Sequence, residues 1–386
     1  MSFLFPEMAE DEQARAEAQA QEAMAAAAAP EDQKSESKIQ ADPLPPTTEQ
    51  WARLYDLAVQ VREMGPWHWM DETQVFGVEH PSTKQLGFVS TMGQLGQHLS
   101  IAVYLGPKAL YDFWDLQDGD GDPMGIFDVP HLQASFDDRE ILEKQDRQII
   151  KELGLKFRGR QQYPLFRAIH IGYVPWFIQS DEAEFLIYAL EQVLEVAPRV
   201  AKDPDILTAE NDPSSQFYLV RVSEFDEGNL QWRDDMRRIP PAPVNKPPVS
   251  PLEARAAEFK SASRIPGLVI EIDLPYLPTP VGERGKRPFF PKGLLMVDAE
   301  SGFILGIETI GPFETPVELD NAIADGISKI FLTNDSLPEE ILVRTTELYR
   351  LLRGWSQKLN IKLRQVDDLP AIEQAKESMF GFFDRR

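Results

Sequence analysis

Four acidic residues in the last third of the chain have the types and settings that metal-dependent chemistry needs. Asp273 and Asp298 each end a strongly apolar run, and Glu308 and Glu347 follow in later segments. Cleavage of a phosphodiester by two metal ions requires carboxylates that converge on ions about 4 Å apart, so that the attacking and leaving oxygens are both held. These four residues are candidate catalytic groups of a metal-dependent nuclease or phosphotransfer enzyme, with Asp273 and Asp298 as candidate ligands for Mg²⁺ or Mn²⁺.

The segments that would position these acids alternate between strand and helix. Apolar runs typical of strands occur at 268–274, 293–298, 303–309, 340–343 and 361–366. The second and third of these runs form a predicted hairpin, because the turn between them contains Gly302. Apolar spacing close to 3.6 residues predicts helices at 316–332 and 347–359, and Asp367-Asp368-Leu369-Pro370 predicts the start of a third. The order β-β-β-α-β-α-β-α requires a mixed sheet flanked by helices.

This order resembles the ribonuclease H-like fold, in particular the core of retroviral-type integrases and transposases. Ile272-Asp273 stands where the first catalytic acid of that family would be, and Val297-Asp298-Ala299-Glu300-Ser301-Gly302 is similar to its long hairpin. Leu337-Pro338-Glu339-Glu340-Ile341 is similar to the approach to its fourth strand. The resemblance implies an α/β, mixed-sheet, ribonuclease H-like domain over residues 263–386.

One position departs from the family pattern. After the fourth strand the chain reads Val343-Arg344-Thr345-Thr346-Glu347, without the aspartate that the family keeps there. Loss of one acid beside an arginine weakens divalent-metal binding, unless Glu347 replaces it. In the alternative interpretation, Asp273 and Asp298 are a strand-end acid and a turn acid that accept backbone N–H groups. We therefore expect a degenerate domain without a cofactor.

A second candidate site is a basic and aromatic stretch in the first half of the chain. Between Lys151 and Trp176 there are five basic residues and one acidic residue. The candidate binding residues here are Arg158, Arg160, Tyr163, Arg167 and Trp176. Basic and aromatic residues together suit phosphates and stacked bases, and arginines also bind carboxylates of a partner or a second domain. The alternative is that the aromatic residues pack into the core and the arginines pair with nearby acids.

A second basic group, Arg284, Lys286 and Arg287, lies in the predicted hairpin region. Together with the first group it would serve a protein that binds nucleic acid without catalysis. The simpler interpretation is a loop that its charges keep soluble.

Composition and patterning predict two domains with a tail and a linker. Residues 1–48 form an acidic, Ala-rich segment expected to be disordered. Residues 49–238 are expected to form an α+β domain with an antiparallel sheet, and 239–262 a Pro-rich linker and a helix. In the first domain we expect strands at 74–78, 86–92, 98–105, 217–222 and 229–232. Helices are expected there at 49–64, 110–114, 139–153 and 181–197.

The charge balance and residue usage exclude several classes of protein. A net charge of −24 disfavours nucleic acid as a partner, because an acidic field repels phosphate. The absence of cysteine excludes disulfides, thiolate zinc sites and cysteine nucleophiles. No apolar run approaches the roughly 20 residues that span a membrane, and no signal peptide is recognisable. We therefore expect a cytoplasmic protein.

The two halves together also resemble a set of bacterial two-domain proteins of unknown function. The residues that carry this resemblance are 154–176 in the first half and 273–306 in the second. The sequence as a whole favours a non-catalytic binding or adaptor protein with a protein partner or an interdomain contact. The metal-dependent enzyme and the non-catalytic nucleic-acid binder remain the alternatives.

Overall fold

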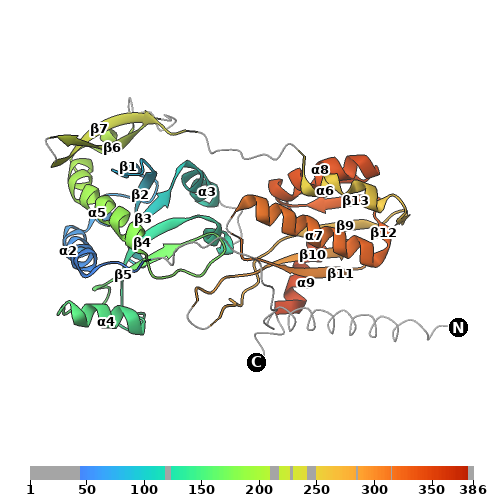
Figure 1. Cartoon of the computed structure of the whole chain (residues 1–386), viewed down its shortest axis with the longest axis horizontal. Helices are drawn as coiled ribbons and strands as arrows, with labels where there is room; N and C mark the ends of the chain where they lie inside the picture. The colour runs from blue at the N-terminus through green and yellow to red at the C-terminus, as the bar shows by residue number, and fades with distance from the viewer. Residues whose placement is uncertain are drawn as a thin grey trace. The chain divides into compact units, whose positions relative to one another are not determined.

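The computed structural model describes residues 44–117, 123–208, 217–226, 229–240, 249–283, 286–313 and 315–380. Of the segment 1–48 that was expected to be disordered, residues 1–43 lie outside this set. The described residues form two compact units, a first domain within 44–240 and a second domain within 249–380. Both combine helices with a β-sheet (Figure 1). No helix in these ranges is long and apolar enough to cross a membrane.

The first domain is built on a seven-stranded sheet with the strand order β5-β4-β3-β2-β1-β6-β7. The strands are β1 (Phe76–Glu79), β2 (Leu86–Met92), β3 (Leu99–Leu105), β4 (His131–Asp137), β5 (Tyr163–Ile169), β6 (Phe217–Asp226) and β7 (Asn229–Arg238). The meander expected over β1, β2 and β3 and the hairpin of β6 and β7 are confirmed. The expectation of an antiparallel sheet is wrong at one place, because β1 and β6 pair in parallel. Strands β4 and β5 were not predicted.

Helices cover both faces of this sheet. Helices α2 (Thr48–Met64) and α5 (Ser180–Val200) pack on one face, where alternate strand residues such as Val89 and Val103 meet them. The residues between these, such as Phe88 and Tyr104, point to the other face and pack with α3 (Pro107–Gln117). Helix α2 begins where the Thr47 side chain accepts the Gln50 N–H.

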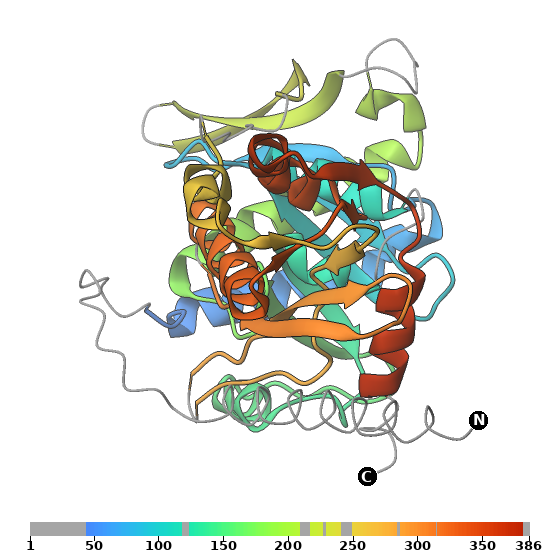
Figure 2. The same cartoon turned by 90° about the vertical axis from the view of Figure 1, so that its right-hand side faces the viewer.

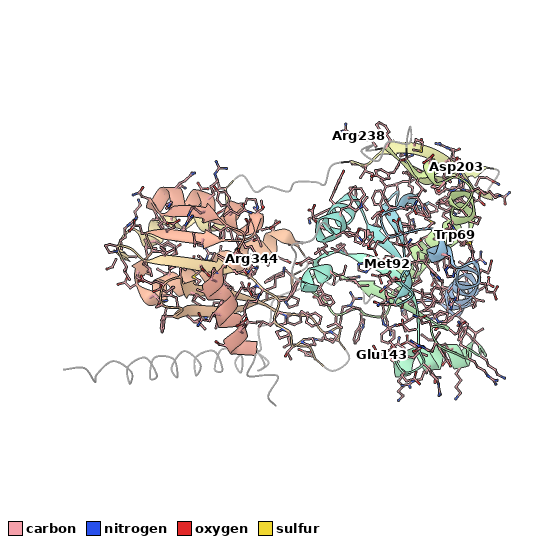
Figure 3. The ribbon with its side chains drawn as sticks, turned by 180° about the vertical axis from the view of Figure 1, so that it is seen from behind. Trp69, Met92, Glu143, Asp203, Arg238 and Arg344 are labelled. Carbon is pink, nitrogen blue, oxygen red and sulfur yellow. The ribbon has the colours of Figure 1, made fainter. Side chains whose placement is uncertain are left out.

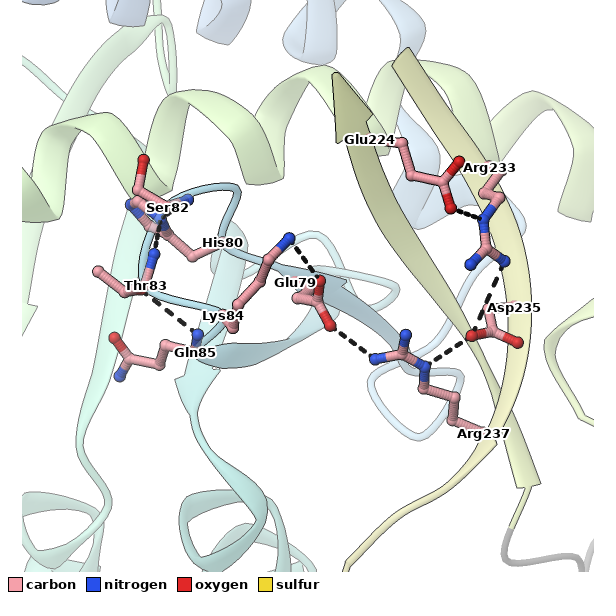
Figure 4. A network of polar contacts seen from close by, with 10 residues as sticks. All are labelled: Glu79, His80, Ser82, Thr83, Lys84, Gln85, Glu224, Arg233, Asp235 and Arg237. Carbon is pink, nitrogen blue, oxygen red and sulfur yellow. Dashed lines mark hydrogen bonds and ion pairs between the residues drawn. The ribbon is translucent and has the colours of Figure 1, made fainter. Parts of the chain in front are cut away.

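A network of charged residues joins strand β1 to the β6–β7 hairpin (Figure 4). The Glu79 carboxylate lies between Lys84 at 3.1 Å and Arg237 at 2.6 Å, and Arg237 also pairs with Asp235 at 2.7 Å. Burial raises the pKa of Glu79, but the two cations outweigh it, so that its pKa lies below the ordinary range. The hairpin is therefore fixed to the sheet by charge as well as by backbone pairing.

Helix α4 (Lys144–Glu152) connects β4 to β5 and is shorter than the helix predicted at 139–153. A capping box sets its start, because the Glu143 side chain accepts an N–H of the first turn while Asp146 accepts the Glu143 N–H at 2.9 Å. Gly154, with φ of 68°, follows its C-terminal end. Residues 139–141 form a turn and not the first turn of the helix.

The second domain is built on a five-stranded mixed sheet with the order β11-β10-β9-β13-β14. The strands are β9 (Val269–Asp273), β10 (Lys292–Asp298), β11 (Ile304–Ile310), β13 (Glu340–Val343) and β14 (Lys362–Gln365). Strands β9, β10 and β11 are antiparallel, whereas β13 pairs in parallel with both β9 and β14. All five strands were predicted to within about one residue. A short parallel pair, β8 (Ser263–Arg264) with β12 (Ser336–Leu337), lies outside this sheet.

Helices α7 (Pro316–Asn334) and α8 (Thr346–Leu359) pack on one face of this sheet, and α9 (Pro370–Phe380) packs on the other. Figure 2 shows α9, in dark red, across the sheet from the orange α7. The helix predicted at 251–262 is wrong in extent: α6 covers Pro251–Ala254, and a short 3₁₀ helix follows at Ala256–Phe259. The three longer helices confirm the predicted order of elements.

Candidate functional site at the end of strand β9

The candidate site begins with the pleat of strand β9. Ile270 and Ile272 face the core beneath α7 and α8. Because side chains alternate along a strand, Glu271 and Asp273 point to the opposite face, toward α9. Both acids are buried, with 2% and 7% of their surfaces exposed. A buried carboxylate needs a cation or hydrogen-bond donors beside it, because removing its charge from water costs free energy.

Arg344 supplies that partner for Asp273. Val343 pairs with Ile272 in the parallel ladder, so the next residue, Arg344, emerges beside Asp273. The Arg344 Nη2 atom lies 2.9 Å from Asp273 Oδ2 and 2.5 Å from Glu373 Oε1 on helix α9. Figure 3 labels Arg344 in the second domain. Asp273, Arg344 and Glu373 are called the Arg344 cluster below.

Charges in the Arg344 cluster stabilise one another. Burial raises the pKa of Glu373, but Arg344 and Lys376, whose Nζ lies 3.1 Å from the carboxylate, hold it below its ordinary value. Burial by itself would lower the pKa of Arg344. The hydrogen bond to Glu373 and the negative charge of Asp273 outweigh burial, so that the pKa of Arg344 lies above its ordinary value. The Arg344 Nε atom is buried and has no hydrogen-bond partner among the described residues. The guanidinium is therefore fully charged where two carboxylates converge.

The other candidate acids lie apart from Asp273. Strand β10 runs antiparallel to β9, so Leu295 pairs with Asp273 and Asp298 pairs with Ile270. Asp298 is therefore about 10 Å further along the sheet, and its carboxylate accepts the Glu300 N–H of the hairpin turn at 2.9 Å.

Glu308 and Glu347 also point elsewhere. The Glu308 carboxylate pairs with Lys329 of α7 at 2.8 Å, on the face opposite Asp273. Glu347 is exposed in the first turn of α8. Within the described ranges, no group of three or more His, Asp or Glu side chains has an arrangement that could hold a metal ion. The described geometry does not bring these four acids together at one point.

Glu271 is the most deeply buried acid near the cluster. Its Oε2 atom accepts the backbone N–H of Ile372 at 2.9 Å, which fixes the first turn of α9 to strand β9. Burial raises the pKa of Glu271, and the Ile372 N–H and the charge of Arg344 only partly offset this.

The raised pKa of Glu271 predicts how a Glu271→Gln variant depends on pH. A folded-state pKa above the unfolded value of about 4.3 means that wild-type stability falls as pH rises through the folded pKa. Glutamine keeps an acceptor for the Ile372 N–H and does not ionise. Urea denaturation between about pH 4 and pH 7 should therefore show the variant gaining stability relative to wild type as pH rises.

Glu340 gives a control of the opposite sign. Burial raises its pKa, but Arg364 and Lys362 outweigh this and lower it. Glu340→Gln should lose stability relative to wild type as pH rises. Parallel pH curves for the two variants would contradict the assignment of burial as the dominant influence on Glu271.

The candidate binding residues of the first domain fall into two groups. Arg167 is buried on β5, where it bonds Asp146 at 2.9 and 2.7 Å and lies 4.4 Å from the centre of the Phe177 ring. The Tyr163 hydroxyl donates to the Phe157 carbonyl at 2.9 Å, and Trp176 pairs by its backbone with Ala168. These three residues are held by their own domain.

Arg158 and Arg160 are the exposed members of the set. The Arg160 Nε atom lies 3.8 Å from Asp138, with 89% of its side chain exposed. Arg158 is exposed and has no ion pair within the described part of the chain. The predicted site therefore combined two kinds of arginine, the buried Arg167 and the exposed Arg158 and Arg160.

The second basic group is partly outside the described residues. Arg284 lies outside them. Lys286 is exposed and pairs with Glu283 at 2.7 Å, and Arg287 is half-buried and engaged. Nothing in this geometry joins the group to the Arg344 cluster.

Each half of the chain matches one family model. Residues 51–220 match a family described as Domain of unknown function (DUF7309), and residues 255–380 match one described as Domain of unknown function (DUF6930). The chain carries two domains of unknown function. No curated protein and no solved structure matches it. The first match covers all strands of the first domain up to the start of β6, and the second covers the whole Arg344 cluster.

Two features of the candidate sites were not predicted from the sequence. Glu373 lies one hundred residues after Asp273, and its only local signal is its place in the first turn of a helix that begins at Pro370. Arg147 and Lys151 are four residues apart, which places them on one face of α4. That spacing is visible in the sequence beside the apolar periodicity of the same segment.

Proposed function

We propose that the protein is a non-catalytic, cytoplasmic binding or adaptor protein whose second domain is a degenerate ribonuclease H-like domain. The order of elements supports the fold assignment, since three antiparallel strands are followed by two parallel strands, each after a helix. The observation that carries the absence of catalysis is Arg344, which directly follows the fourth strand of this order.

The position of the Arg344 charge between two carboxylates supports a binding role over a catalytic one. Its guanidinium occupies the point between Asp273 and Glu373 where a metal-dependent site needs a divalent ion. A fixed positive charge at this point repels a divalent cation and saturates the carboxylates that would bind it. In this proposal the domain is a stable α/β scaffold with surfaces for a protein partner, and it does not catalyse phosphoryl transfer.

Calorimetric titration of the full chain with Mn²⁺ tests this proposal. We expect no saturable binding at micromolar metal, either for wild type or for Asp273→Asn. Asp298→Asn is the matched control, because this acid lies in the hairpin turn away from the cluster. Micromolar binding that is present in wild type and in Asp298→Asn but lost in Asp273→Asn would overturn the proposal and favour the metal-dependent enzyme.

A further inference from the structure

Helix α4 and the loop after it form one side of an open groove in the first domain, here called the α4 groove. Its volume is about 310 Å³. The floor is apolar and consists of Leu142, Ile150, Leu155 and the ring of Tyr163. The rim carries Arg139, Arg147, Lys151 and Lys156, and none of the described acidic residues lines it. An apolar floor with a cationic rim is unusual on a chain with a net charge of −24.

The rim cations make no side-chain ion pair or hydrogen bond within the described residues, unlike most of the other basic side chains there. Four arginines in the described ranges make no side-chain ion pair or hydrogen bond: Arg139, Arg147, Arg158 and Arg353. Two of these line the groove and Arg158 lies two residues beyond Lys156. Lys151 and Lys156 are also exposed and unpaired within the described part of the chain.

The nearest acids do not neutralise this rim. Asp146 is already bound to Arg167 inside the domain, and the Glu152 carboxylate accepts from Gln148 at 2.7 Å. Glu140 and Glu143 are exposed on the same segment. They lower the local positive charge without lining the groove.

The groove suits carboxylates beside an apolar side chain better than the stacked bases of a nucleic acid. The aromatic rings beside it are engaged with one another, since Phe157 stacks on Tyr55 and makes an edge contact with the Tyr163 ring. Base stacking needs a free ring. Arginine and lysine over an aliphatic floor fit acidic side chains next to an apolar one.

We propose that the α4 groove binds an acidic peptide segment of a partner protein, with an apolar side chain on the floor and carboxylates on the cationic rim. This inference rests on the proposed binding role and specifies the chemical character of the partner. It does not depend on the Arg344 cluster, so the Mn²⁺ titration and the experiment below can fail separately.

The experiment is a titration of the full chain with a short synthetic peptide in which one phenylalanine is flanked by glutamates. We expect saturable binding, which Arg147→Glu combined with Lys151→Glu weakens by about tenfold or more. Raising the ionic strength from about 0.01 M to about 0.15 M shortens the Debye length from about 30 to about 8 Å and should weaken binding further. Arg139→Glu combined with Lys156→Glu, outside the helix, should have the same effect without a change in α4.

The controls separate the groove from general charge. Lys144→Glu is the matched control, because Lys144 is exposed and unpaired on the same helix but does not line the groove; it should leave binding within about twofold of wild type. A peptide with glutamine in place of glutamate, or with alanine in place of phenylalanine, should bind weakly. The proposal is overturned if wild type does not bind the peptide, if Lys144→Glu is as harmful as the rim variants, or if a single-stranded oligonucleotide binds more tightly.

Discussion

Replacement of Arg167 by methionine is expected to lower the free energy of unfolding of the first domain by about 3–5 kcal/mol. Only 9% of the Arg167 side chain and 6% of the Asp146 side chain are exposed. Methionine keeps much of the packing against Phe177 but leaves the Asp146 charge buried without a cation. Urea denaturation followed by tryptophan fluorescence reports this domain, since six of the seven tryptophans lie in it.

The companion variant Arg167→Met with Asp146→Asn isolates the cause. Asparagine removes the stranded charge and still accepts the Glu143 N–H that begins α4. The double variant should recover a large part of the lost stability, because the penalty comes from an uncompensated charge. A loss below about 1 kcal/mol for the single variant, or no recovery in the double variant, would contradict this account.

Replacement of Arg344 by methionine is expected to destabilise the second domain by roughly 2–3 kcal/mol. This is less than the full cost of breaking a buried pair, because 35% of the Arg344 side chain is exposed and water screens part of the change. Asp273 and Glu373 lose their shared cation, and Glu271 loses a nearby positive charge. Hydrogen exchange measured by mass spectrometry resolves the effect on β9, β13 and α9.

Arg353→Met provides the comparison for Arg344→Met. Arg353 is an exposed arginine of the same domain, without a partner among the described residues, and its loss should change stability by about 0.5 kcal/mol at most. Arg344→Asp sharpens the experiment, because it adds a carboxyl group where the cation lay. Mn²⁺ should raise the melting temperature of Arg344→Asp and leave wild type unchanged. Equal stabilisation of both by Mn²⁺ would show that Arg344 does not exclude metal.

The second domain was predicted from the sequence almost strand by strand, for a physical reason. Its strands are mostly apolar runs bounded by turn residues, and such runs bury on both faces of a sheet. In the first domain β5 was missed, because Pro164 and Arg167 lie inside it. Pro164 lies on an edge strand, where proline is tolerated, and Arg167 is neutralised by a residue from a different element.

The candidate sites were less predictable than the fold. From the resemblance we expected an acid to be missing beside Arg344, but which side chains surround Arg344 depends on the face that each strand residue takes and on where α9 packs. Asp298 illustrates the difficulty, since it ends a strand as Asp273 does but on an antiparallel neighbour, which carries it to the other end of the ladder. The α4 groove likewise exists only after α4, Arg139 and Lys156 are brought together by the fold.

The cation at the end of β9 is covalently part of the chain, and this has a consequence for how the domain meets its surroundings. A bound metal ion leaves when its free concentration falls, so a site that depends on one is emptied by chelators and filled again by supply. Arg344 cannot dissociate, and its protonation does not change at physiological pH. The positive charge at this strand end is therefore present in every copy of the protein, whatever the metal content of its surroundings.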